Sequence, residues 1–267
     1  MCPAEIDRNI AAPTSVPDAQ IPTYRCRLHV PSSLSVGATP ELDRDHVHYL
    51  RAVLRVAPGE AIALFNGTDG EWLARIEAVN KREVGLIIDH QLRAPAPTPP
   101  LWVGIPPIKK HRLDFMIEKA TELGVTRIIP LLTDHVGAGR VRADRWRAQV
   151  IEASEQCERL DVPQVDEPAC LADWLGAWPD DHTLVVALER APAVTQAYGE
   201  WLAQVSAGPV GFAVGPEGGF SARERSWLMA RKGLQLVDLG SSILRAETAL
   251  LSLLVGYRIV GRALTPR

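Results

Sequence analysis

The sequence has few cysteines, and no pair of them has the spacing of a metal or redox motif. Four cysteines occur among 267 residues, Cys2, Cys26, Cys157 and Cys170, and they form no CxxC motif. A chain that relied on a disulfide framework or a structural zinc ion would carry cysteines at more regular spacing. We therefore expect reduced and mostly packed thiols, as in a cytosolic protein.

The chain also lacks an excess of charge of one sign and long apolar runs. Its formal net charge is −3, so any RNA contact must depend on local basic patches. No run approaches eighteen apolar residues, and residues 1–20 lack the apolar core of a signal peptide. With 46% hydrophobic and 23% charged residues, the chain is typical of a soluble globular protein. We expect a cytoplasmic location and no membrane partner.

Motifs for nucleotide phosphates and for metals are missing as well. The sequence contains neither GxxxxGK[ST] nor GxGxxG, which disfavours a generic nucleotide-phosphate enzyme. Its histidines, cysteines and carboxylates form no cluster at ligand spacing. The sequence thus predicts no metal site.

The most informative stretch that is present covers residues 210–224. Residues 210–214 are small, apolar or β-branched, as in a strand buried on both faces. Residues 215–220, Gly-Pro-Glu-Gly-Gly-Phe, must turn sharply and leave room for close approach, and Ser221 with Glu224 forms a capping box that starts a helix. This order predicts a small-molecule site at the carboxyl end of a sheet. A tight turn without a ligand is the alternative.

A second stretch of the same kind follows. Residues 234–239 have the pattern of a strand, and residues 240–249, Gly-Ser-Ser-Ile-Leu-Arg-Ala-Glu-Thr-Ala, open a helix. GPEGGFS followed by LGSSILRAETA resembles the C-terminal signature of the RsmE family, SPOUT-class methyltransferases that methylate N3 of a uridine in 16S ribosomal RNA. The family pattern has a basic residue in place of Ser242 and a threonine in place of Ala246. KATELGV at 119–125 and EASEQC at 152–157 add to the resemblance, which covers roughly residues 24–262.

A proline-rich segment divides the chain. Residues 22–93 combine short strands, one short helix and an Asn-Gly hairpin signal, which predicts a small β-barrel. Residues 94–100 are a stiff connector, and alternating strands and helices in 101–267 predict a mostly parallel sheet covered on both faces. Residues 1–21 are predicted to be a disordered extension. Strands are expected at 24–30, 61–65, 71–76, 84–88, 101–105, 127–132, 183–188, 210–214 and 234–239, and helices at 43–55, 113–123, 143–160, 194–205 and 246–260.

The resemblance gives this α/β outline a more specific form. It implies a PUA-like β-barrel that holds RNA, followed by a SPOUT trefoil-knot methyltransferase domain. S-adenosylmethionine would lie in the knot, and the chain would form a homodimer. The implied partner is 16S ribosomal RNA or the small ribosomal subunit.

The two glycine-rich loops and the end of the 183–188 strand supply the candidate cofactor residues. Backbone groups in such loops can hydrogen-bond adenine edges without crowding the ring. Under the resemblance, the candidates are Leu188, Glu189, Gly215, Glu217, Gly218, Leu239, Gly240, Ile243 and Leu244.

Methylation at uracil N3 requires loss of the N3 proton or stabilisation of the developing anion. Arg245, at a helix start beside a cofactor loop, is the candidate for stabilising charge on O2 and O4. Glu247 is a candidate general base, with bracing of the helix as the alternative. A mechanism without a general base remains open.

RNA binding must come from clusters of basic residues, each of which has a solvated surface as its alternative role. One cluster is expected on a loop before the 113–123 helix and another after residue 139. The candidates are Arg25, Arg27, Arg51, Arg55, Lys109, Lys110, Arg112, Arg140 and Arg142.

Two further functions stay open at this point. One is another SPOUT activity, such as ribose 2′-O-methylation or methylation of a different base. The other is a non-catalytic RNA-binding assembly factor, which Ser242 at the position of a basic residue makes conceivable.

Overall fold

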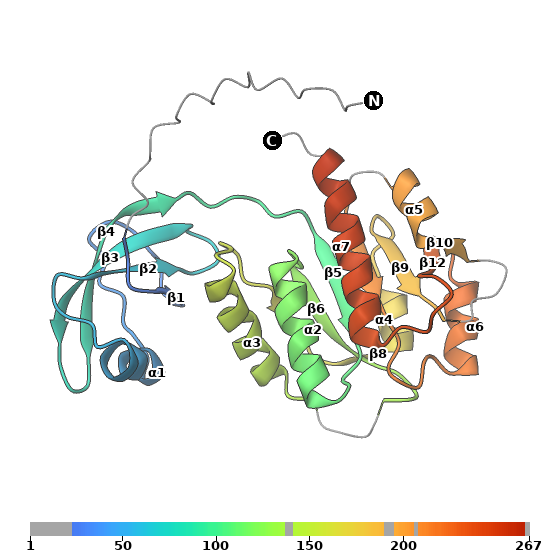
Figure 1. Cartoon of the computed structure of the whole chain (residues 1–267), viewed down its shortest axis with the longest axis horizontal. Helices are drawn as coiled ribbons and strands as arrows, with labels where there is room; N and C mark the ends of the chain where they lie inside the picture. Colours follow the sequence, from blue (N-terminus) through green and yellow to red (C-terminus); the bar gives the residue numbers. More distant parts are fainter. Residues whose placement is uncertain (1–22, 137–140, 190–194, 206–207, 265–267) are drawn as a thin grey trace, which may run out of the picture.

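The structure, a computed structural model, describes residues 23–136, 141–189, 195–205 and 208–264. Figure 1 shows an N-terminal group of strands beside a larger unit of helices and strands. The predicted extension at 1–21 and the candidate Arg140 lie outside the described residues.

The N-terminal unit is a four-stranded sheet in the order β1-β2-β3-β4. The strands are β1 (Arg27–His29), β2 (Ala61–Phe65), β3 (Glu71–Val79) and β4 (Val84–Arg93). The segment after β1 pairs with the far edge, because Gly37 N–H donates to the Ile88 carbonyl and Ile88 N–H donates to that of Ala38, both at 2.9 Å. The sheet therefore curls back on itself around an apolar core, as expected for a small barrel.

The helix expected at 43–55 consists of two consecutive segments of different helix type. Asp43 caps the short helix α1 (Arg44–His48), which continues as the π-helix η1 (Tyr49–Val53). Its end is set by Arg55, whose φ of 53° is left-handed. The π-helix has a wider turn than an α-helix, and the spacing of the apolar residues does not predict it.

No helix or strand lies between Arg93 and Leu101 in the structure. Beyond this segment the strands lie in the order β10-β12-β9-β11-β5-β6-β7, and all neighbours on this path are parallel. Their bounds are β5 (Leu101–Ile105), β6 (Arg127–Leu132), β7 (Gln164–Val165), β9 (Thr183–Ala187), β10 (Gln196–Ala197), β11 (Val210–Ala213) and β12 (Leu234–Asp238), with β8 (Ala169–Cys170) paired to β6. The expected parallel sheet is confirmed.

Helices cover both faces of this sheet (Figure 1). They are α2 (Lys110–Glu122), α3 (Ala143–Gln156), α4 (Leu171–Ala177), α5 (Tyr198–Gln204), α6 (Ala222–Ala230) and α7 (Ala246–Leu264). Side chains of α2, α3, α5 and α7 share one apolar cluster, and those of α4 and α6 belong to a second. No helix within the described ranges is both long and apolar enough to cross a bilayer.

Several predicted helix boundaries are wrong, and the last helix, expected to end at residue 260, runs to Leu264. The loop expected at 109–112 is largely the first turn of α2, since the Lys109 carbonyl accepts the amides of Arg112 and Leu113. The helix expected to reach residue 160 ends at Gln156, and Glu158 adopts a left-handed φ of 58°. The helix expected from 194 begins at Tyr198, because Gln196–Ala197 forms strand β10 instead.

The two units are joined through β1 and α3. Arg27 is buried, and its guanidinium pairs with Glu71 and donates to the Ser154 and Arg159 carbonyls, the first at 2.7 Å. The His29 amide donates to a Glu155 carboxylate oxygen at 2.8 Å. The proposed phosphate contact of Arg27 is therefore wrong, because this side chain connects the two units from the inside.

Candidate functional site

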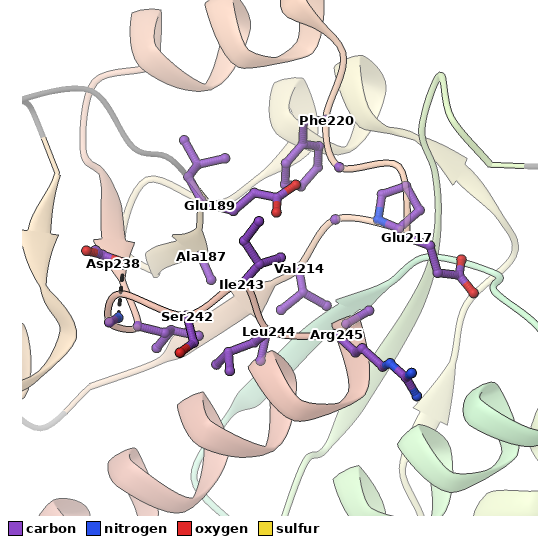
Figure 2. Close-up of a pocket in the computed structure, with 18 of the residues that line it drawn as sticks. Ala187, Glu189, Val214, Glu217, Phe220, Asp238, Ser242, Ile243, Leu244 and Arg245 are labelled. Atoms are coloured by element: carbon purple, nitrogen blue, oxygen red, sulfur yellow. Dashed lines mark hydrogen bonds between the residues drawn. The ribbon is translucent and has the colours of Figure 1, made fainter.

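A cavity of about 540 Å³ lies where the carboxyl ends of three neighbouring strands meet the start of α7. β9 lies between β11 and β12, so the loops that follow these strands converge at one edge of the sheet. Figure 2 shows Glu217 and Arg245 on one side of the cavity and Asp238 on the opposite side, with the Glu189 side chain between them beside Phe220. The 215–220 and 239–245 segments, predicted to form one site, line the same cavity.

The loop after β11 is fixed by the predicted capping box. Ser221 accepts the Glu224 amide, and Glu224 in turn accepts the Ser221 amide at 2.8 Å. Its second oxygen accepts the Asp134 amide at 2.8 Å, so Glu224 is buried with both oxygens hydrogen-bonded. Hydrogen bonds from Ser221 and then Arg223 keep the pKa of Asp134 below its usual value. The cap of α6 thereby connects the glycine loop to the loop after β6.

His135 contacts the glycine loop from outside the cavity. Its Nδ1 lies 3.0 Å from the carbonyl oxygens of both Gly218 and Gly219. Gly218 does not line the cavity, because it packs against His135, and a Cβ there would lie 3.1 Å from the His135 Cβ. Sequence reasoning missed His135, since nothing local signals a contact more than eighty residues away.

Gly219 turns the loop toward the end of β9. Its φ is 66°, and a Cβ at this position would lie 2.8 Å from a Glu189 carboxylate oxygen. Leu188 and Glu189 both line the cavity, and the Leu188 amide donates to the Val237 carbonyl at 3.1 Å. The glycine thus makes room for the Glu189 side chain at the cavity wall.

The loop after β12 forms the opposite wall. Asp238 accepts the Gly240 amide at 3.1 Å, and Gly240 has a φ of 116°. Leu239 and Leu244 pack against the core while Ile243 is 61% exposed. The cavity-lining candidates are Leu188, Glu189, Gly215, Glu217, Leu239, Gly240, Ile243, Leu244 and Arg245; Ser242 also lines it.

Several charged side chains lie together at the wall of the cavity that contains Glu217. Arg112, from the first turn of α2, lines the cavity together with Glu217 and Arg245. Its guanidinium lies 3.5 Å from a Glu217 oxygen and 3.6 Å from a Glu247 oxygen. Glu247 itself does not line the cavity, and its other carboxylate oxygen is buried without a hydrogen-bond partner. The arrangement is a cation flanked by two carboxylates at the cavity wall.

Known proteins share both units of this chain. A family model described as RNA methyltransferase domain matches residues 95–256, and one described as RNA methyltransferase PUA domain matches residues 42–89. The ribosomal RNA small subunit methyltransferase E of Rickettsia conorii is 34% identical over 236 residues, which are 88% of this chain and 96% of that protein. The chain belongs to the ribosomal RNA small subunit methyltransferase E family.

Solved structures of similar proteins confirm the fold class, a PUA-like unit followed by an α/β methyltransferase unit. The Neisseria gonorrhoeae ribosomal RNA small subunit methyltransferase E, bound to S-adenosylmethionine, superposes with a TM-score of 0.75 at 31% identity over 89% of this chain and 98% of that one. A Legionella pneumophila protein in complex with the same cofactor gives a TM-score of 0.79 at 26% identity over 90% and 98%.

The basic residues proposed for RNA in this family member have different surroundings. Arg25 donates to the Leu54 carbonyl and lies 3.7 Å from Glu60, and Arg51 donates to the Lys81 carbonyl. Arg55 and Lys109 are exposed, while Lys110 and Arg142 are exposed and pair with Asp114 and Asp144. All six stay candidates for phosphate contacts, whereas Arg112 belongs to the cavity wall.

The structure describes three of the four cysteines, and they differ in burial. Cys26, Cys157 and Cys170 are free, and burial raises the pKa of the Cys26 thiol to about 12. Cys170 is exposed, so the expectation of packing is wrong for this residue. No three His, Cys, Asp or Glu side chains gather as metal ligands among the described residues.

Proposed function

We propose that this chain transfers a methyl group from S-adenosylmethionine to N3 of a uridine in 16S ribosomal RNA of the small ribosomal subunit. The observation that carries the proposal is the single cavity built from the ends of β9, β11 and β12, with Arg245 at its wall. The family membership supports ribosomal RNA as the substrate. The position on the base rests on the resemblance of the two loop motifs.

The residues of the cavity fit the cofactor. A volume of about 540 Å³ suits a ligand of this size, and Val214, Leu239 and Leu244 offer apolar walls for an adenine ring. Asp238 brings a carboxylate to the side opposite Arg245, and Glu189 brings one to the wall beside Phe220, and both can accept hydrogen bonds from ribose hydroxyls (Figure 2). Glycine at position 219, where a Cβ would lie 2.8 Å from a Glu189 carboxylate oxygen, supports a wall shaped for close contact with a ligand.

When bound, S-adenosylmethionine supplies a sulfonium methyl group; its transfer to nitrogen leaves the C–S electron pair on sulfur and the nitrogen proton in water. The protein contributes alignment and stabilisation of charge. Arg245 would donate to a uracil carbonyl oxygen as N3 loses its proton. Glu247 lies behind Arg112 rather than at the cavity surface, which supports a positioning role over the general-base role first considered.

RNA would reach this cavity through contacts from both units. Arg25, Arg51 and Arg55 on the PUA-like unit, with Lys109, Lys110 and Arg142 near α2 and α3, are the proposed phosphate contacts. Replacing Lys109 and Lys110 by glutamine should weaken RNA binding and flatten its salt dependence. An unchanged salt slope would remove that pair from the interface.

We also propose the homodimer and the trefoil knot that the resemblance implies. Val255 and Ile259 are exposed one turn apart on α7, which supports an apolar contact with a second copy. α7 follows β12 but lies against α2, where Arg258 donates to the Glu122 carbonyl at 2.7 Å. This return of the chain is compatible with a knot. Ribosomal substrates and free thiols favour action in the cytoplasm.

A deletion strain tests the function. Nucleosides from its 16S ribosomal RNA should lack N3-methyluridine and regain it when the gene is restored. Loss of a 2′-O-methylated nucleoside or of another methylated base would favour the alternative activity. No change in any nucleoside, together with no cofactor binding by calorimetry, would favour the non-catalytic assembly factor.

A further inference from the structure

We propose that Arg112 is a second uracil-binding guanidinium, which acts with Arg245 on the two carbonyl oxygens of the target base. This inference rests on the proposed function and deepens it. It gives Arg112 a role in selecting uracil and in stabilising the N3 anion, in place of the phosphate contact that its basic neighbours suggested.

The position of Arg112 separates it from the rest of its cluster. Lys110 projects into solvent with 68% of its side chain exposed, whereas the Arg112 side chain is 20% exposed and lines the cavity. Arg112 lies beside the N-terminus of α7, because it contacts Glu247, two residues after Arg245. Two guanidinium groups therefore line one cavity close to the same helix start.

The guanidinium of Arg112 still has hydrogen-bond donors to offer. Its contacts with Glu217 and Glu247, at 3.5 and 3.6 Å, are longer than an N–H···O hydrogen bond. Across the described ranges, no hydrogen bond joins its side chain to a protein acceptor, and its two ion-pair contacts leave the donors of the planar fork free for a ligand.

Glu217 and Glu247 hold this cation where the helix alone would disfavour it. A positive charge in the first turn of α2 is opposed by the helix dipole, and that turn contains no acidic residue. The two carboxylates come from separate elements, the loop after β11 and the start of α7. They act as positioning residues, because each fixes the guanidinium through a charge contact from a different side.

The chemistry of uracil explains why two guanidinium groups are useful. Its edge presents O4, N3–H and O2, and loss of the N3 proton to water spreads the negative charge over both oxygens. Donors from Arg112 and Arg245 can stabilise these oxygens while N3 stays free to accept the methyl group. Cytosine carries an amino group in place of O4, and a guanidinium has no acceptor for it. The pair thus favours uracil over cytosine.

The test compares Arg112→Gln and Arg112→Lys with Lys119→Gln, a charge change farther along α2. Small ribosomal subunits serve as substrate, and product is measured as N3-methyluridine by mass spectrometry. Wild type is measured first: if it forms no N3-methyluridine, the proposed function itself fails. With an active wild type, Arg112→Gln should lose on the order of 100-fold in turnover, as for removal of one oxyanion donor. Arg112→Lys should retain more activity, and Lys119→Gln should match wild type.

Three further measurements separate this role from structural or phosphate-binding roles. In Arg112→Gln, the affinity for S-adenosylhomocysteine and the salt slope of RNA binding should stay as in wild type. Subunits reconstituted with 5-fluorouridine, whose N3 is more acidic, should recover about tenfold of the lost rate, because less anion stabilisation is needed. Thermal unfolding of each variant checks that it is folded.

The inference is overturned by any of three results. Arg112→Gln could turn over as fast as wild type. The salt dependence of its RNA binding could fall by the amount expected for one phosphate contact, which would make Arg112 a phosphate contact. Arg112→Gln could lose turnover that 5-fluorouridine does not restore, which would make its role structural.

Discussion

Glu224 and Asp134 are joined by a 2.8 Å hydrogen bond from the Asp134 amide to a Glu224 carboxylate oxygen, across 90 positions of sequence. The other Glu224 oxygen closes the capping box of α6. One buried carboxylate therefore stabilises a helix start and fixes the loop that carries His135, which contacts the glycine loop of the cavity.

Replacing Glu224 by alanine should affect both stability and cofactor binding. Two backbone amides would lose their acceptor, and we expect a loss of about 1–3 kcal/mol in the free energy of unfolding. Urea unfolding and calorimetry with S-adenosylhomocysteine measure the two effects. Glu200→Ala, an exposed acid in the first turn of α5, is the control and should change neither. Unchanged cofactor affinity in Glu224→Ala would show that this cap does not support the cavity.

Replacing His135 by alanine should weaken cofactor binding with little effect on stability, in contrast to Glu224→Ala. The glycine loop would lose a contact to two of its carbonyls, so the cofactor dissociation constant should rise by about tenfold while the folded core stays intact. Calorimetry beside thermal unfolding measures this, with the exposed His90→Ala as control. Equal losses of affinity in both variants would contradict the role of His135.

Gly219 and Gly233 form a matched pair for testing the wall near Glu189. Both have left-handed φ values, 66° and 79°, so alanine at either site should cost about 1 kcal/mol of stability through backbone strain. A new Cβ meets the Glu189 carboxylate at Gly219 and nothing within 4 Å at Gly233. Cofactor affinity should therefore fall in Gly219→Ala alone. A similar loss in Gly233→Ala would assign the effect to strain rather than crowding.

Glu71 should make the free energy of unfolding depend on pH in the acidic range. Its side chain is 4% exposed between Arg27 and Arg93. Burial raises the pKa of Glu71, but hydrogen bonds from Arg93 and Arg27 outweigh this, and its net pKa lies below 4.5. Since the folded pKa is lowered, this stabilisation is present above pH 4.5 and is lost as the pH falls through the folded pKa.

Glu71→Gln leaves two arginines without their shared carboxylate and should lose about 3 kcal/mol near neutral pH. Urea unfolding should show the difference in unfolding free energy between wild type and Glu71→Gln narrowing as the pH falls through the lowered pKa of Glu71. Glu167→Gln, which disrupts a surface pair with a 78% exposed carboxylate, should cost almost nothing. If the difference in unfolding free energy between wild type and Glu71→Gln stays constant with pH, Glu71 is not ionised in the folded chain.

The sequence predicted those features that depend on neighbouring residues. The capping box of Ser221 and Glu224, the parallel strands and the two glycine loops all follow from local spacing, and the structure contains each. Arg27 was misassigned because its partners at 154 and 159 are brought to it only by folding. For the same reason no local pattern could reveal His135 behind Gly218 or the contact of Arg112 with Glu247.

Uracil N3 methylation is tested most directly by nucleoside mass spectrometry of small subunits incubated with the purified chain and S-adenosylmethionine. Wild type should form N3-methyluridine. Arg245→Ala should form almost none while its affinity for S-adenosylhomocysteine stays near that of wild type. A methyl group found on a ribose or another base, or undiminished N3-methyluridine in Arg245→Ala, would contradict the account.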